Sequence, residues 1–474
     1  MKENKTKSMI ILLINILFVT FFSISSSKCF SNNSNIADTY NHFFTWICIL
    51  AMIEIISFKM KKISIYDFIL WFIAISYFFM FGFIFQGFFN LKTTLLWNPL
   101  KYYSYNEIFK AYSFAILSLS SFSTGYLIFY FAEKSINKYG LKELKKQSYN
   151  KKMFIIGVTV LTIGTIAKLI NDIGLITKVR VANSYTAFST ATSTGLFDDL
   201  AFLCLPGLFC IFYSGCATEK SKKNLFYFFL IYYIVMMLLT GSRKIQVFSI
   251  LSLTLGYNFS IERRKEKVPI WKIIVYLVLS LITVNILIII RKNRFDLSTI
   301  IPTFVDNLLS LNLFENIFGE VFSETGITIL SVASIIKSVP AIFPFEYGKT
   351  FLRTIPSIFP IGWLSGDFFS KASSTNVINA YTKIPVGSSF IGDLYWNWGY
   401  CGGILMAFVS GIIVQKIISI NNKQSRIGYA IYFSVFSQLI VLVRAELFDI
   451  FRPLFMIFII KLIIEKVKIP IKEE

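Results

Sequence analysis

The sequence predicts an all-α polytopic membrane protein with about 12 transmembrane helices, on the basis of its composition, its apolar segments and its alternating basic connections. Hydrophobic residues make up 55% of the 474 residues, aromatic residues 17%, and the mean hydropathy is +0.65. These values lie well above the apolar share of a soluble domain. The net charge of +21 comes from short lysine clusters between apolar stretches, where it meets membrane lipids, so nucleic acid is not expected as a partner.

Apolar segments of roughly the 20 residues that a helix needs to cross a bilayer occur along the chain. They lie near residues 8–25, 42–58, 65–89, 108–131, 153–171, 198–217, 225–241, 244–260, 270–290, 397–415, 428–443 and 453–466. The first segment begins like a signal peptide, but its apolar run is long and Lys28 disrupts a lipobox at Cys29. We therefore expect an uncleaved first helix.

Every second connection between these segments is basic, which predicts the orientation because Lys and Arg remain in the cytoplasm during insertion. Both termini are therefore expected in the cytoplasm of a multi-pass protein. The predicted division of the chain is transmembrane helices one to nine over 1–290, a large extracytoplasmic loop over 291–395, and helices ten to twelve with a cytoplasmic tail over 396–474.

The predicted outer loop alternates apolar stretches with charges and prolines, so we expect it to lie on the membrane rather than to form a soluble domain. Residues 324–339 suit an amphipathic helix that is either interfacial or re-entrant. The prolines between 340 and 360 predict irregular backbone shielded by protein. Such a surface suits the covering of a lipid-linked substrate.

Arginines are few, and most map to the outer side against the positive-inside bias. The outward arginines are Arg180, Arg243, Arg291, Arg294, Arg353, Arg444 and Arg452. A guanidinium group binds phosphate through two parallel donors, which a topology signal does not need. Those at outer helix ends are predicted to bind a phosphate or other polyanion, with helix capping, extension to the lipid headgroups or carboxylate pairing as the alternative. These are Arg243, Arg291, Arg444 and Arg452. For Arg180 and Arg353 we expect the capping or pairing role.

Three local patterns carry these residues. The first, Gly241-Ser242-Arg243-Lys244, joins two apolar helices with almost no loop, so that its cations lie at the membrane boundary. The stretch from Gly387 to Gly399 carries Asp393 and an aromatic belt into helix ten. The stretch from Arg444 to Arg452 alternates positive and negative charges within one outer connection.

At these residues the chain resembles the Wzy-type O-antigen and capsule polymerases, also called oligosaccharide repeat unit polymerases. The resemblance covers most of the chain in architecture and is most specific at the three patterns. It implies a fold like that of the integral membrane glycosyltransferases that use polyprenyl-linked donors. It also implies polymerisation of undecaprenyl-diphosphate-linked oligosaccharide repeat units into O-antigen, capsule or exopolysaccharide, at the outer face of a bacterial cytoplasmic membrane. A polysaccharide chain-length regulator is the implied partner, and no metal or other cofactor is expected.

The chemistry expected from the residues themselves agrees with the polymerisation that the resemblance implies. Fixed cations stabilise the negative charge that grows on a diphosphate leaving group, so Lys244 and Arg294 join the four arginines in the predicted binding set. The acceptor hydroxyl needs a general base. The outward carboxylates are Glu315, Glu320, Glu324, Asp367, Asp393, Glu446 and Asp449. We favour Asp393 and Glu446 as catalytic because they adjoin the helix ends that bear the motifs. Their alternative role is to hold an arginine in place.

Two other titratable residues have less prominent predicted roles. His42, the only histidine, lies near the outer start of helix two and is expected to be interfacial. Glu54 is expected to pair with Lys59 or Lys61.

Two other classes of membrane protein share some of these features. A flippase or transporter for lipid-linked oligosaccharide would carry related halves and no long outer loop. An O-antigen ligase would carry a histidine in its outer loop, and none occurs between 291 and 395. The sequence therefore favours a polymerase over both.

Overall fold

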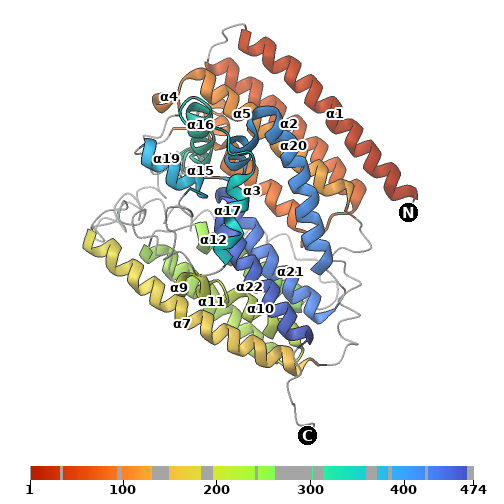
Figure 1. Ribbon diagram of the computed structural model, residues 1–474, viewed down its shortest axis with the longest axis vertical. Coiled ribbons are helices and arrows are strands. Elements are labelled where there is room, and N and C mark those ends of the chain that lie inside the picture. Colours follow the sequence, from red (N-terminus) through yellow and green to blue (C-terminus); the bar gives the residue numbers. More distant parts are fainter. Residues whose placement is uncertain are drawn as a thin grey trace.

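The computed structural model is helical wherever it describes regular structure. It describes residues 2–31, 36–92, 99–130, 149–182, 196–240, 244–261, 302, 313–358, 371–382, 387–421 and 425–466. The helices are α1 (Lys2–Ser31), α2 (Ile36–Lys61), α3 (Phe68–Phe88), α4 (Pro99–Tyr102), α5 (Tyr105–Ile128), α7 (Lys151–Ala182), α9 (Leu196–Ala201), α10 (Cys204–Ser214), α11 (Glu219–Thr240), α12 (Lys244–Ile261), α15 (Leu313–Gly326), α16 (Thr328–Ser338), α17 (Lys349–Thr354), η2 (Pro356–Ile358), α19 (Ser374–Thr382), α20 (Phe390–Asn421), α21 (Arg426–Leu439), η3 (Ile440–Arg444) and α22 (Leu447–Lys466). Figure 1 shows α1 and α7 on opposite sides of the molecule, with α21 and α22 between them.

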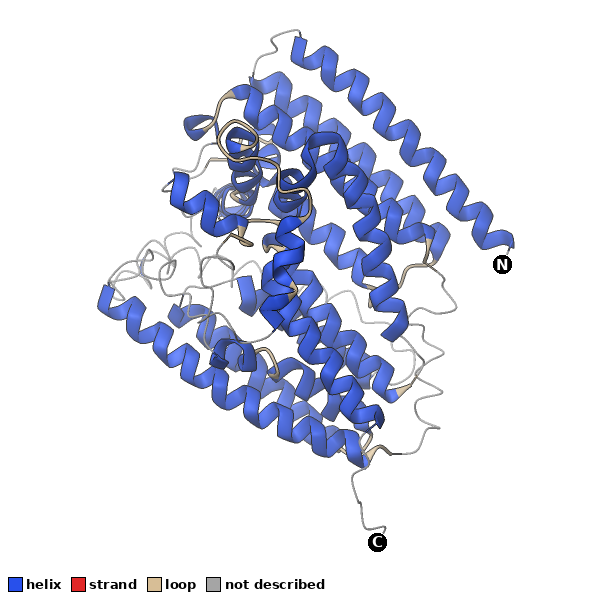
Figure 2. Ribbon diagram, viewed as in Figure 1, coloured by secondary structure: helices blue, strands red, loops and turns tan. Residues whose placement is uncertain are grey.

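Long apolar helices make the chain a multi-pass membrane protein. Nine helices of the described part are long and apolar enough to cross a membrane, judged by length and composition, and one of them is the stretch Phe318–Ser338, which includes most of α15 and all of α16. Each predicted segment coincides with a helix except 270–290, which lies outside the described residues. The total of about 12 spans therefore remains a prediction. Figure 2 shows how completely helices account for the regular structure that is drawn.

Two helices of the predicted outer loop, α15 and α16, pack into the helical bundle. α15 runs antiparallel to α3, since a Cβ atom on Gly319 would lie 2.0 Å from the Lys92 carbonyl oxygen and one on Gly326 would lie 2.6 Å from the Phe83 nitrogen. α16 then ends beside the start of α5, where the Lys337 ammonium lies over the Tyr103 ring at 5.7 Å from its centroid. Both ends of the pair thus lie where α3 finishes and α5 begins. This is the geometry of a re-entrant segment.

The helix α20 is bent back on itself at Gly399, whose φ of 68° and ψ of −163° only glycine adopts readily. A Cβ atom on Gly403 would lie 3.1 Å from the Leu394 carbonyl oxygen, so the arms before and after the bend lie side by side. We call residues 390–398 the short arm and residues 400–421 the long arm. The sequence placed the start of this helix at 397 and did not predict the bend.

Both arms pack along the same part of α5. The Phe390 ring of the short arm lies 5.9 Å from the Phe122 ring. A Cβ atom on Gly411 of the long arm would lie 2.2 Å from the Phe122 carbonyl oxygen, and one on Gly125 would lie 2.1 Å from the Phe408 carbonyl oxygen. Such close backbone approach between membrane helices requires glycine. The α5–α20 contact therefore fixes the position of the short arm along α5.

The expected pairing of Glu54 with Lys59 or Lys61 is wrong. Glu54 is buried and accepts a hydrogen bond of 2.7 Å from the Tyr77 hydroxyl on α3. Lys61 instead donates to the side chains of Asn4 and Ser8. The physical reason is helix geometry, because only residues three or four positions apart face each other on a helix.

The packing of α5 against α20 predicts that Gly125→Ala destabilises the protein. The added methyl group overlaps the backbone of Phe408, and such overpacking costs about 1–3 kcal/mol. Gly174→Ala is the matched control, since a Cβ atom at this helical glycine meets nothing within 4 Å and alanine favours the helix by about 1 kcal/mol. Thermal unfolding in detergent measures both. Equal midpoints for the two variants would contradict the described α5–α20 contact.

Candidate functional site

Three helices begin at one place in the structure, and their N-termini surround Asp393 and Glu446. Ser374 begins α19, the short arm of α20 begins just before Asp393, and α22 begins directly after Glu446. The Leu447 backbone N–H donates to Asp393 Oδ2 at 3.1 Å, and the Thr375 N–H donates to Glu446 Oε2 at 3.2 Å. Each carboxyl group therefore caps the start of a helix other than its own. We call these two residues the carboxyl pair.

Serines complete the site, and they also determine where the helices start. Ser373 Oγ accepts from the Asn376 N–H, and Ser389 Oγ accepts from the Gly392 N–H, so each serine caps its helix in the usual way. Ser373 also donates to Glu446 Oε1 at 2.5 Å. Ser374 Oγ lies 2.5 Å from Asp393 Oδ1 and 2.8 Å from Glu446 Oε2, and therefore joins the carboxyl pair.

The carboxyl pair is almost fully buried. Asp393 is 6% exposed and Glu446 is 3% exposed, while Ser374 is inaccessible. Burial raises the pKa of Glu446 above its ordinary value, and the nearby Asp449 carboxylate raises it further. Hydrogen bonds from Ser373, Ser374 and the Thr375 N–H oppose this effect. Such an environment brings a carboxyl group towards the protonation equilibrium that a general base needs.

The site lies at the depth of membrane-spanning helices rather than at their ends. Phe122, beside the first residue of the short arm, lies about 25 Å along α5 from Tyr105 and about 9 Å from the other end of this helix at Ile128. The Arg444 guanidinium, close in sequence to Glu446, lies 5.7 Å from the centroid of the Phe79 ring. Phe79 in turn lies about 13 Å along α3 from its end at Phe88. The connection between η3 and α22 is therefore recessed in the bundle.

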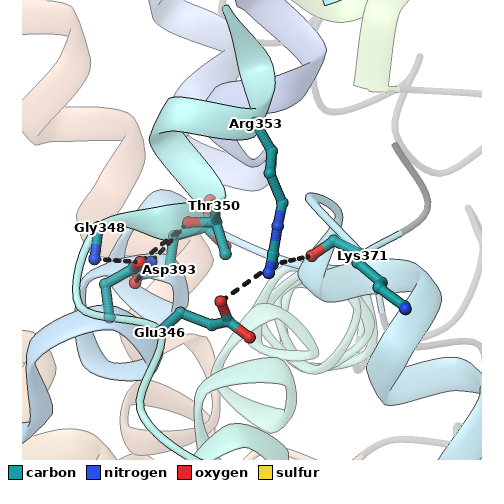
Figure 3. Close-up of polar contacts among 7 residues, drawn as sticks. Glu346, Gly348, Thr350, Arg353, Lys371 and Asp393 are labelled. Carbon is teal, nitrogen blue, oxygen red and sulfur yellow. Dashed lines mark hydrogen bonds and ion pairs between the residues drawn. The ribbon is translucent and has the colours of Figure 1, made fainter. Parts of the chain in front are cut away.

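The segment 346–353 supports the short arm at its other end. The backbone N–H groups of Glu346 and Tyr347 donate to the carbonyl oxygens of Trp396 and Asn397 at the end of the short arm. The Asn397 side chain also accepts from the Gly348 N–H at 2.9 Å and donates to Thr350 Oγ1 at 2.8 Å (Figure 3). These contacts satisfy carbonyl groups that the bend at Gly399 would otherwise leave unpaired.

The structure places the described arginines in different surroundings. Arg353 forms an ion pair of 2.9 Å with Glu346 and donates to the Lys371 carbonyl oxygen (Figure 3), so its expected pairing role is confirmed. Arg452 forms an ion pair of 2.5 Å with Asp199 of α9.

The rest of the predicted phosphate-binding set is only partly described. Arg243, Arg291 and Arg294 lie outside the described residues. Lys244 begins α12. Arg444 is the predicted phosphate ligand nearest in sequence to the carboxyl pair. The convergence of Arg243, Arg291, Arg444 and Arg452 on one cavity therefore remains a prediction.

A separate hollow of about 550 Å³ lies between α1 and α2 and includes His42. His42 Nε2 lies 3.2 Å from Ser26 Oγ, and the imidazole ring stacks against Phe22 and Phe109. These neighbours come from α1 and α5. The histidine is thus part of this hollow and shares no described contact with the carboxyl pair.

Sequence reasoning selected both members of the carboxyl pair but missed the serines that join them. The Ser388-Ser389 pair before a helix start was visible as a capping signal, and Ser373-Ser374 is a similar signal before α19. The contacts of Ser373 and Ser374 with Asp393 and Glu446 could not be predicted, because these segments are far apart in the chain. Asn397 was also missed, because an asparagine in an aromatic stretch carries no recognisable pattern.

The ion pair between Arg452 and Asp199 predicts energetic coupling between α22 and α9. Arg452→Gln leaves a partly buried carboxylate without this partner and lowers the unfolding midpoint, whereas Asp199→Asn in the Arg452→Gln background costs little more. The coupling free energy is expected to be about 0.5–3 kcal/mol. A double-mutant cycle of thermal unfolding in detergent measures it. Strictly additive effects would mean that the pair does not form.

Residues 9–474 match the model of one protein family, described as O-antigen polysaccharide polymerase Wzy. Neither a curated protein nor a solved structure matches the chain.

Proposed function

Because the chain belongs to the O-antigen polysaccharide polymerase family Wzy, we propose that it polymerises lipid-linked oligosaccharide repeat units into a surface polysaccharide. The donor is an undecaprenyl-diphosphate-linked glycan, and the acceptor is a sugar hydroxyl of a second lipid-linked unit. Transfer takes place on the outer side of a bacterial cytoplasmic membrane, in a chain with both termini in the cytoplasm. A chain-length regulator is the proposed protein partner.

The observation that supports this proposal most is the carboxyl pair at membrane depth. A polyprenyl carrier keeps its diphosphate close to the membrane, so the reacting sugar reaches a recessed site without leaving the carrier. There, Glu446 or Asp393 removes the proton of the acceptor hydroxyl while the bond between the donor sugar and its diphosphate breaks. A buried carboxylate surrounded by protein dipoles is positioned before the reaction begins, which lowers the cost of reorganisation.

Arginine supplies the second part of the proposed mechanism. Negative charge grows on the diphosphate as the bond breaks, and a guanidinium group in a water-poor site stabilises that charge more in the transition state than in the ground state. Arg444 is proposed for this role because it lies on the same recessed connection as Glu446. Arg243, Lys244, Arg291, Arg294 and Arg452 are the further proposed ligands.

The proposal is tested with purified protein in lipid vesicles, supplied only with undecaprenyl-diphosphate-linked repeat units. We expect longer lipid-linked glycans in the presence of a chelator and without nucleotide, because the donor is already activated. A flippase would move the substrate without lengthening it, and a ligase would require a different acceptor. Either result would contradict polymerisation, and a requirement for a divalent ion would contradict the proposed metal-free mechanism.

The same assay tests the base. Glu446→Gln and Asp393→Asn keep the side-chain shape and remove the ionisable oxygen, so at least one should lower the rate by about 10²- to 10⁴-fold. Asp38→Asn is the matched control, since this carboxylate is exposed on α2 beside the separate hollow. If both site variants polymerise at the wild-type rate, the carboxyl pair is not the base.

A further inference from the structure

The hydroxyl group of Ser374 has three oxygen neighbours, although it carries only one proton. Its Oγ atom lies 2.5 Å from Asp393 Oδ1, 2.8 Å from Glu446 Oε2 and 2.5 Å from Ser388 Oγ. A serine hydroxyl donates one hydrogen bond and accepts up to two. All three distances are therefore compatible with hydrogen bonds only if Ser374 donates once and accepts twice.

With all three contacts taken as hydrogen bonds, this count restricts the protonation states of the carboxyl pair. If Ser374 donates to Glu446, it accepts from Ser388 and from Asp393, and an aspartate side chain donates only when it is protonated. If Ser374 donates to Asp393, the same argument requires a protonated Glu446. Donation to Ser388 would require protons on both carboxyl groups. In every arrangement at least one carboxyl group carries a proton on the oxygen that faces Ser374.

The remaining donors select Glu446 as the ionised member. Apart from Ser374, its oxygens accept from the Ser373 hydroxyl at 2.5 Å and from the Thr375 N–H at 3.2 Å. Asp393 accepts from the Leu447 N–H at 3.1 Å. Its other contact is the Ser388 hydroxyl at 3.4 Å, whose single proton is also directed at Ser374. Donors stabilise a carboxylate, so the group with more of them keeps the charge.

We propose that Ser374 is a positioning residue that lets Asp393 and Glu446 share one proton, so that the carboxyl pair acts as a single base. This inference rests on the proposed function, in which the pair receives the proton of the acceptor hydroxyl. In the resting state the Asp393 O–H donates to Ser374, and the Ser374 O–H donates to Glu446.

The proton balance of the transfer is complete without another reactant. The acceptor oxygen forms the new glycosidic bond and gives its proton to the Glu446 carboxylate, while the electron pair of the breaking bond leaves with the diphosphate. The pair then holds two protons and releases one to water before the next cycle. When a proton passes from Asp393 to Ser374 and the serine proton passes to Glu446, the charge moves between the two carboxyl groups and Ser374 is unchanged.

Of the charged groups named here on the surrounding helices, only Asp449 affects the pKa of Glu446, and the others have described contacts elsewhere. Asp449 on α22 raises the pKa of Glu446 and so contributes to its titration. The Arg444 guanidinium of η3 lies over Phe79, and Lys337 of α16 lies over Tyr103. Arg353 of α17 is paired with Glu346. The pH dependence is therefore assigned to the carboxyl pair.

The pH dependence of polymerisation tests the role of Ser374. The base acts when Glu446 is ionised, so the rate rises with pH through the raised pKa of Glu446. Ser374→Ala removes a donor to the ionised group, which raises this pKa further and moves the acid limb to higher pH by about one unit or more. Ser374→Thr keeps the hydroxyl group and should restore the wild-type profile. Ser331→Ala is the control, since this buried serine donates only within α16 to the Thr328 carbonyl oxygen.

An acid limb that does not move in folded Ser374→Ala protein would overturn the inference. Size-exclusion chromatography shows whether the variant is folded. If it is not, Ser374→Cys replaces it, because a thiol is a weak donor of similar shape and should shift the limb in the same direction.

Infrared spectroscopy tests the shared proton without any substrate. The difference spectrum between wild-type protein and Asp393→Asn at neutral pH should contain the carbonyl band of a protonated carboxylic acid, and Ser374→Ala should shift that band. A spectrum without the band overturns the shared proton even if the protein polymerises glycans. A protein that has the band but does not polymerise would contradict the proposed function instead.

Discussion

Two carboxyl groups buried among membrane-spanning helices are the constraint on which the rest of this structure depends. An unpaired carboxylate is costly away from water, and the cost is removed by a counter-charge, by hydrogen bonds or by protonation. Here the N–H groups at the starts of α19 and α22 and the hydroxyl groups of nearby serines provide hydrogen bonds to Asp393 and Glu446. The partial positive charge at each helix N-terminus adds to this stabilisation. The fold must therefore bring three helix starts together.

The means of doing so are local and depend on few residues. Gly399 folds α20 back so that its short arm begins deep in the bundle rather than at the end of a span. The close contact at Gly125 and Gly411 fixes that arm against α5. The recessed connection before α22 brings Glu446 to the same place. In such a poorly hydrated position the attraction between a guanidinium group and a diphosphate is stronger than at the surface, which is the setting that the proposed mechanism requires.

The sequence allowed the helices to be predicted because apolar runs of the right length have few alternatives in a membrane. It also identified Asp393 and Glu446, since charged residues at helix ends stand out against an apolar background. The bend at Gly399 was not predicted because the helix was expected to start at 397, so that most of the short arm was assigned to the outer loop. Ser374 was missed because its importance comes from contacts with Asp393 and Glu446, whose spacing follows no helical period. Glu54 was assigned the wrong partner because the alternative, Tyr77, belongs to another helix.

The central claim is that glycan transfer takes place at the recessed carboxyl pair. Photocrosslinking tests it most directly, with a lipid-linked repeat unit that carries a photoreactive group on its acceptor sugar. After irradiation in lipid vesicles, mass spectrometry locates the labelled residues. Labels are expected in α19, in the short arm of α20 and at the start of α22. Labels confined to the hollow between α1 and α2, around His42 and Trp46, would contradict it.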